Sequence, residues 1–163
     1  MTLARFSTPL IIVILAVFAT AAMQTIGIQQ LPDFSDYEVE IYNGPVSAVD
    51  LSSHKDAKMF RTRLRDAAKG DVNFGGHFIL TFWGCGTSCQ TGAIIDAKTG
   101  AVYFPDELRA TVFSDLDDRL VDYRTDSTLI IVRGHMREED EAKVTYLVWE
   151  NGSFKHLSST PLK

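Results

Sequence analysis

The sequence predicts a mainly β domain of the α+β class: an antiparallel meander of two blade-like strand units with one packed basic helix. Three observations lead to this expectation. Apolar, β-prone runs recur between glycine-containing turns, only one segment has clear helical spacing, and an order of strand, loop, strand, tight turn and strand occurs twice. The first strands of the two copies end at Gly84 and Gly134, 50 residues apart. Two units cannot close a propeller, so we expect them side by side or merged into a single twisted sheet.

Residues 1–22 have the pattern of a secretory signal peptide. Arg5 supplies a positive charge, Leu10 to Phe18 are all apolar, and Ala19-Thr20-Ala21 is a small-residue cleavage site. The apolar stretch is shorter than the roughly 20 residues that span a bilayer. We therefore expect a periplasmic or secreted protein with no stable membrane span after cleavage. The alternative is a retained N-terminal anchor in the inner membrane.

The rest of the chain is expected to hold one folded domain. Residues 23–36 are predicted to be a lead-in tether, and residues 37–163 a single β-rich domain. Apolar residues make up 45% and charged residues 23%, an ordinary globular composition. The net charge of −5 has the wrong sign for general nucleic-acid binding. Composition does not determine the oligomeric state.

One segment has the pattern of an amphipathic helix. Ser53 is expected to cap its N-terminus, with Asp56 three residues later, and Gly70 is expected to follow its C-terminus. Its apolar stripe consists of Ala57, Phe60, Leu64, Ala67 and Ala68. Its polar face carries the cations Lys55, Lys58, Arg61, Arg63, Arg65 and Lys69. Such a face is either simply solvated or a binding surface for a partner or an anionic polymer.

Strands are expected on both sides of this helix. Tyr37–Tyr42 (YEVEIY) alternates apolar and acidic residues, as a half-buried strand does. FILTFW begins at Phe78, and AIID and AVYF form a hairpin whose turn contains Gly100 and is supported by Asp96. TLIIVRG, VTYLVW and SFKHL follow, and Asn151-Gly152 predicts a tight hairpin between the last two.

The two cysteines, Cys85 and Cys89, leave three readings open. In an oxidising compartment they are expected to form a local disulfide, for which the neighbouring glycines permit the necessary turn. Thiol chemistry would need a nearby base such as His77, and the C-x-x-x-C spacing differs from the C-x-x-C of redox motifs. A metal site would need His77 and His135 as well, at spacings that match no standard zinc arrangement.

A resemblance extends from His54 to Pro105, with the sequence HKDAKMFRTRLRDAAKGDVNFGGHFILTFWGCGTSCQTGAIIDAKTGAVYFP. This stretch, about a third of the chain, resembles a group of small secreted bacterial proteins that share an F-R-T-R-L helix, an N-F-x-G-H strand entry and a W-G-C-G-T-x-C loop. The resemblance implies export and a shared fold, but no particular activity. It also implies one constellation made of Arg61, Arg63, His77, Trp83, Cys85 and Cys89.

These features favour an exported, non-enzymatic binding or inhibitor-like module of the bacterial envelope. Its disulfide-stapled WGCGTSC loop is expected to meet an envelope protein or an anionic ligand, and no catalytic residue, metal or cofactor is expected. The candidate binding residues are Trp83, Thr87, Ser88, His77, Arg61, Arg63 and Arg65. The alternative is a thiol-redox or metal-binding protein or enzyme that uses Cys85, Cys89 and His77.

Overall fold

The computed structural model describes residues 30–86, 89–109, 111–112, 121–135 and 141–162. They belong almost entirely to the second of the chain's two compact units, Leu31–Lys163. The predicted signal peptide lies outside the described residues. Within the described ranges, no helix is long and apolar enough to cross a bilayer.

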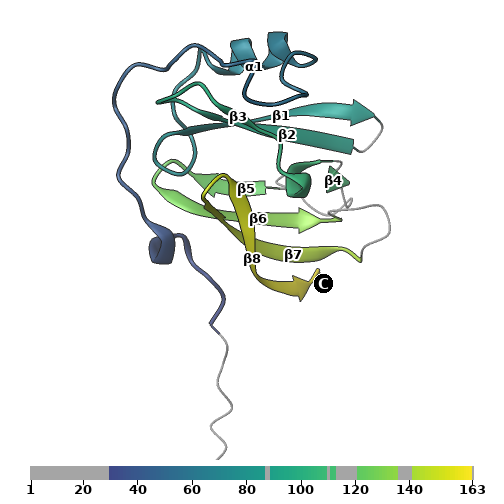
Figure 1. Cartoon of the computed structure of the whole chain (residues 1–163). Helices are drawn as coiled ribbons and strands as arrows, with labels where there is room; N and C mark the ends of the chain where they lie inside the picture. Colours follow the sequence, from purple (N-terminus) through teal and green to yellow (C-terminus); the bar gives the residue numbers. More distant parts are fainter. Residues whose placement is uncertain (1–29, 87–88, 110, 113–120, 136–140, 163) are drawn as a thin grey trace, which may run out of the picture. The chain divides into compact units, whose positions relative to one another are not determined.

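Two antiparallel sheets form this unit (Figure 1). In the first sheet, β1 (Phe78–Gly86), β2 (Cys89–Asp96) and β3 (Val102–Tyr103) are neighbours in that order, and the short β4 (Thr111–Val112) also pairs with β2. The second sheet consists, in chain order, of β5 (Val121–Arg124), β6 (Ser127–Gly134), β7 (Lys143–Glu150) and β8 (Ser153–Pro161). The mainly β class is confirmed, and each sheet contains one of the two predicted strand units.

The two sheets are stacked, because both of them contribute side chains to one central core. Leu80 and Ile94 of the first sheet pack with Ile130, Leu147 and Trp149 of the second. Alternate residues of each strand point to the opposite face, as the pleat requires. The outer face of the first sheet therefore forms a second cluster with α1 (Arg61–Ala67), and that of the second sheet a third cluster with η1 (Phe34–Tyr37).

The helix is shorter than predicted, and Ser53 does not cap it. Residues 54–60 form turns, and α1 begins after Phe60, whose side chain makes no capping hydrogen bond. The Ser53 hydroxyl instead donates to the Asp50 carbonyl and accepts from the amide of Val102 on β3. A contact with a distant strand thus takes the place of the local cap. The predicted apolar stripe is confirmed, since Ala57 and Leu64 are fully buried with the other stripe residues packed around them.

The strand predicted at Tyr37–Tyr42 is not formed. The structure has one isolated bridge there, between Glu38 and Ser127, and no ladder. Residues 38–50, which we call the strap, run past the ends of both sheets (Figure 1). Their amides donate singly to turn carbonyls: Val39 to Asp126, Tyr42 to Gly76, Ser47 to Ala97 and Asp50 to Gly100. Apolar and acidic residues alternate in YEVEIY because one side of this extended segment lies against these turns. Phe34, within the expected lead-in, is also buried, against the second sheet.

The N-F-G-G-H segment joins the strap to both sheets. The Asn73 side chain donates to the Leu80 carbonyl and accepts from the Leu80 amide, so it covers part of the free edge of β1. The Gly75 and Gly76 amides donate to carbonyls of the turn between β5 and β6. At Gly76 the backbone is left-handed (φ +81°), and an added Cβ would lie 2.5 Å from the Glu40 carbonyl oxygen. Only glycine satisfies both conditions without strain.

Both predicted hairpin turns are confirmed. Asn151 (φ +50°) and Gly152 (φ +80°) form the tight β7–β8 turn that an Asn-Gly dipeptide favours. In the β2–β3 turn, the carboxylate of Asp96 accepts from the amide of Lys98, and Gly100 has φ +80°.

We expect Gly76→Ala to lower the free energy of unfolding by at least about 2 kcal/mol, because it combines left-handed strain with a clash against the strap. Gly84→Ala is the matched control on β1, since its nearest neighbour would lie 3.9 Å away. Urea unfolding of both variants measures the difference, and equal stabilities would show that the strap does not constrain Gly76.

Candidate functional site

The hairpin between β1 and β2 ends in a disulfide. Cys85 and Cys89 are bonded, with their Cα atoms 5.2 Å apart, and this prediction is confirmed. The strand register shifts between Gly84 and Gly86, so the bridge closes an irregular hairpin end. Cys85 and its two neighbouring glycines are exposed. Thr87 and Ser88, the candidate contact residues within the loop, lie outside the described residues.

Trp83 belongs to the core, which argues against the idea of an exposed aromatic anchor. Its side chain is only 7% exposed and lies in the cluster between the first sheet and α1. The ring of Phe60 is 4.9 Å from the indole, between centroids, and Phe104 meets the indole edge-on. The guanidinium of Arg63 lies 6.0 Å above the ring centroid. Trp83 therefore holds the segment of α1 against the strand that carries Cys85.

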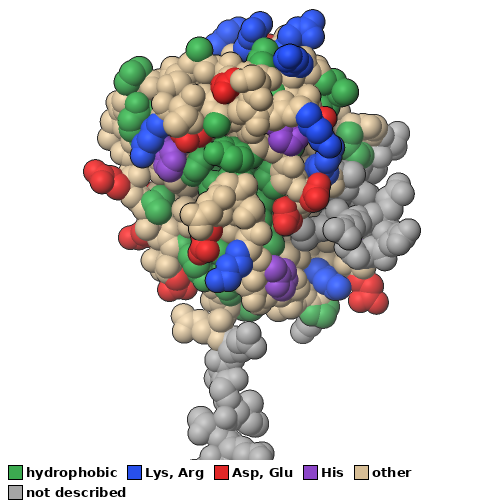
Figure 2. All heavy atoms as spheres, in the orientation of Figure 1, with side chains coloured by type: hydrophobic (Ala, Val, Ile, Leu, Met, Phe, Trp, Pro, Cys, Tyr) green, Lys and Arg blue, Asp and Glu red, His purple; other side chains and the backbone are tan. Residues whose placement is uncertain are grey.

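Four exposed cations lie in the segment that packs on this indole: Lys58, Arg61, Arg63 and Arg65, which we call the basic surface. Blue side chains gather over α1 in Figure 2, at the top of that view. Among the described residues, none of the four makes an ion pair. The nearby Lys69, in contrast, is paired with Asp66 at 2.6 Å.

The position of Arg61 does not favour the helix. Arg61 and Arg65 are four residues apart on α1, a spacing at which like charges repel by a few tenths of a kcal/mol. Arg61 also stands in the first turn, where unpaired amides favour an anion, and no acidic residue is present in that turn. Arg65 stands in the last turn, where a cation is favourable, so local electrostatics oppose the position of Arg61 and its proximity to Arg65.

His77 lies far from the disulfide. It immediately precedes β1, whereas Cys85 is near the other end of that strand, about 25 Å away at the rise of an extended chain. Burial lowers the pKa of His77 below its ordinary value of 6.5, Lys98 lowers it further, and Asp96 acts in the opposite direction. The imidazole stacks on Phe78, with ring centroids 4.0 Å apart. The expected constellation is therefore divided: Arg63, Trp83 and the disulfide adjoin one another, and His77 does not join them.

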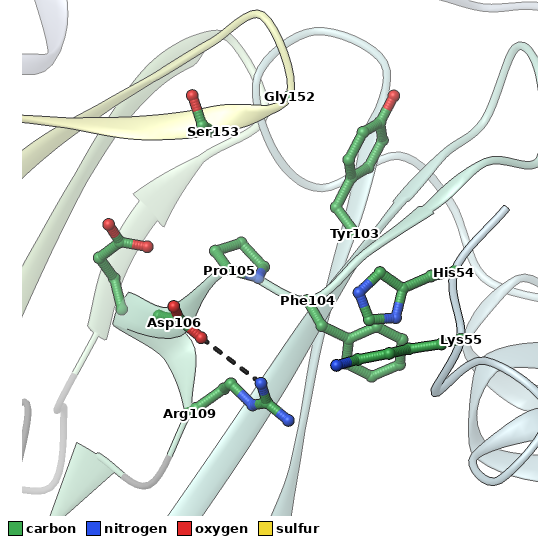
Figure 3. Close-up of a pocket in the computed structure, with 10 residues that line it drawn as sticks. His54, Lys55, Tyr103, Phe104, Pro105, Asp106, Arg109, Gly152 and Ser153 are labelled. Carbon is green, nitrogen blue, oxygen red and sulfur yellow. Dashed lines mark hydrogen bonds and ion pairs between the residues drawn. The ribbon is translucent and has the colours of Figure 1, made fainter.

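A cavity of about 540 Å³ escaped the sequence analysis. Three segments line it: His54 and Lys55 before α1, residues 103–107 with Arg109 around η2 (Asp106–Leu108), and Gly152 and Ser153 at the β7–β8 turn (Figure 3). No short motif could reveal a site whose walls are about 50 residues apart in the chain. The only hint of this cavity in the sequence is that ionisable residues occur in both segments: His54 and Lys55 in the first, Asp106 and Arg109 in the second.

The chain matches no protein-family model, no curated protein and no solved structure. The assignment of function therefore rests on the residues and their geometry.

We expect reduction of the disulfide, or the double substitution Cys85→Ser and Cys89→Ser, to lower the free energy of unfolding by about 2 kcal/mol, because the bridge closes only a small loop. The paired strands below it should keep the fold. Intact-mass measurement after alkylation, with and without reductant, tests the bond, and urea unfolding tests its contribution. Alkylation of both thiols before reduction would contradict a stable bridge.

The pKa of His77 predicts a pH dependence of stability. Below pH 6.5 the unfolded chain binds a proton at His77 before the folded chain does, so the free energy of unfolding falls as the pH drops below 6.5 and does not change above it. We expect His77→Gln to reduce the change in urea midpoint between about pH 7.5 and about pH 5.5. Asp33 and Asp50 do not contribute there, because hydrogen bonds from Ser35 and Ser52 hold their pKa values below 3.8. An unchanged pH profile would refute this assignment.

Proposed function

We propose that the protein is an exported, non-enzymatic binding module of the bacterial envelope, which binds an anionic partner through the basic surface beside its disulfide-stapled hairpin. The observation that carries this proposal is the group of exposed cations Lys58, Arg61, Arg63 and Arg65, without ion pairs among the described residues, on a chain of net charge −5. An acidic protein that gathers cations on one surface presents a local field opposite to its overall charge, which orients it toward anions.

The composition of the surface supports a partner with phosphate, sulfate or carboxylate groups. Three of the four cations are arginines, whose planar guanidinium can donate two parallel hydrogen bonds to such groups. Within the part of the chain that the structure describes, Arg61 and Arg65 have neither an aromatic ring nor a carboxylate as a partner. Their unfavourable mutual placement on α1 is relieved when an anion lies between them.

The packed Trp83 indole and the Cys85–Cys89 disulfide hold the basic surface rigid. Trp83 fixes α1 through Phe60, and Cys85 follows two residues later along β1, so the hairpin end lies next to Arg63. A surface that is ordered before binding loses less conformational entropy on binding. The exposed hairpin end at Cys85 then lies at the rim of the basic surface, and Thr87 and Ser88, outside the described residues, stay candidate contact residues by sequence.

We expect the double variant Arg61→Glu with Arg65→Glu to lose retention on immobilised heparin, used here as a polyanion probe. Each substitution removes a cation and adds a repelling carboxylate. The stability of the variant should change little, because a carboxylate at position 61 suits the first turn of α1, one at position 65 is unfavourable in the last turn, and the like-charge repulsion is not increased. The salt concentration of elution and the urea midpoint are the two measurements.

The matched control is Lys143→Glu with Lys155→Glu, two exposed lysines on the second sheet. It changes the net charge by the same amount, so it should still elute near the salt concentration of the natural protein. Equal loss of retention in both double variants would indicate a response to net charge alone, and would remove the basis for a specific basic surface.

A further inference from the structure

The cavity of about 540 Å³ has a volume suited to a small organic ligand and walls of opposite charge. In Figure 3, His54 and Lys55 lie on one side, Asp106 and Ser153 on the other, with Phe104 and Pro105 between them. The Phe104 ring is covered by His54 at 4.8 Å between centroids. The cavity thus offers an apolar floor between a basic and an acidic wall.

The basic wall has donors that no described residue uses. Lys55 is exposed and makes no ion pair among the described residues, and its ammonium points into the cavity (Figure 3). The Nδ1 atom of His54 accepts a hydrogen bond from the Asp56 amide at 3.2 Å. The neutral imidazole therefore carries its proton on Nε2, where it can donate to a ligand.

Arg109 is held in place by two carboxylates, which offset its positive charge in the cavity. One terminal nitrogen lies 3.4 Å from Asp56 and the other 3.4 Å from Asp106. Its charge is thereby largely compensated within the protein. Glu107, the second acid of the lining, makes no ion pair among the described residues.

Arg109 and Asp106 of the lining are paired with each other, but Lys55 has no such acidic partner across the cavity among the described residues. Lys55 is not within ion-pair distance of Asp106 or Glu107, so these groups remain separated by the cavity. A simple anion would be repelled by the Glu107 carboxylate, and a simple cation by the Lys55 ammonium. A ligand that carries both charges satisfies both walls, and each charge-assisted hydrogen bond adds to its affinity.

We propose that this cavity binds a small zwitterion with the chemistry of a short peptide. Its carboxylate accepts hydrogen bonds from Lys55 and His54, its ammonium donates to Glu107 and Asp106, and its chain lies on Phe104 and Pro105. The volume exceeds what an isolated ion requires and suits a ligand of several linked groups. This site is separate from the basic surface and does not depend on the proposed binding of a polyanion.

The test compares trialanine with two blocked analogues, N-acetyl-trialanine and trialanine amide, by NMR titration of the amides of Gly152 and Ser153. We expect trialanine to bind about tenfold more tightly than either analogue, since each lacks one charge-assisted contact. Lys55→Gln should abolish the advantage of trialanine over the amide, and Glu107→Gln its advantage over the N-acetyl form. Glycine, which has both charges but little chain, should bind more weakly than trialanine.

The variant Lys69→Gln, which changes an exposed lysine outside the cavity, should bind trialanine like the natural protein. The Arg61→Glu, Arg65→Glu variant should also do so, which separates this site from the basic surface. If the blocked analogues bind as tightly as trialanine, or if none of the three shifts the Gly152 and Ser153 resonances at millimolar concentration, the zwitterion site is overturned.

Discussion

The structure depends on the close contact of backbones at Gly75 and Gly76. Here the strap, the entry to β1 and the turn between β5 and β6 meet, and amides and carbonyls are paired across all three. The space beside Gly76 is filled by the Glu40 carbonyl, so a larger residue would separate the elements. Because this junction fixes where β1 begins, it also fixes which faces of the strand receive Leu80 and Trp83 and how the two sheets face each other.

The framework of the two sheets holds the two candidate sites in place in different ways. The basic surface is carried by a short helix that would not persist alone, and packing on Trp83 and Phe60 provides its stability. The zwitterion cavity is built where an edge strand, a short 3₁₀ turn and a hairpin turn converge, with Gly152 close against the Tyr103 ring. One site is thus a convex surface and the other a concave one, and they use separate cations of the same segment.

The sequence was sufficient wherever the determining chemistry is local. Asn151-Gly152, Asp96 with Gly100, and the Cys85–Cys89 bridge each follow from residues a few positions apart. Prediction failed where a distant backbone intervened. Ser53 binds β3 and so leaves the helix uncapped, and YEVEIY serves as a strap. The cavity could not be foreseen for the same reason, since its chemistry exists only after both sheets have stacked.

The strap also has a consequence for the order of folding. Its partners are late in the chain, since the Ser47 hydroxyl donates to the Lys98 carbonyl 51 residues away. In η1, just before the strap, the Phe34 carbonyl accepts from the Ser127 hydroxyl 93 residues away. The part of the domain that is synthesised first therefore docks only after the later hairpins have formed. Such non-local closure slows folding, because the entropy of a long loop is lost before its contacts stabilise the chain. In a nascent chain of this kind, the strap stays undocked until the hairpins that hold it have been synthesised.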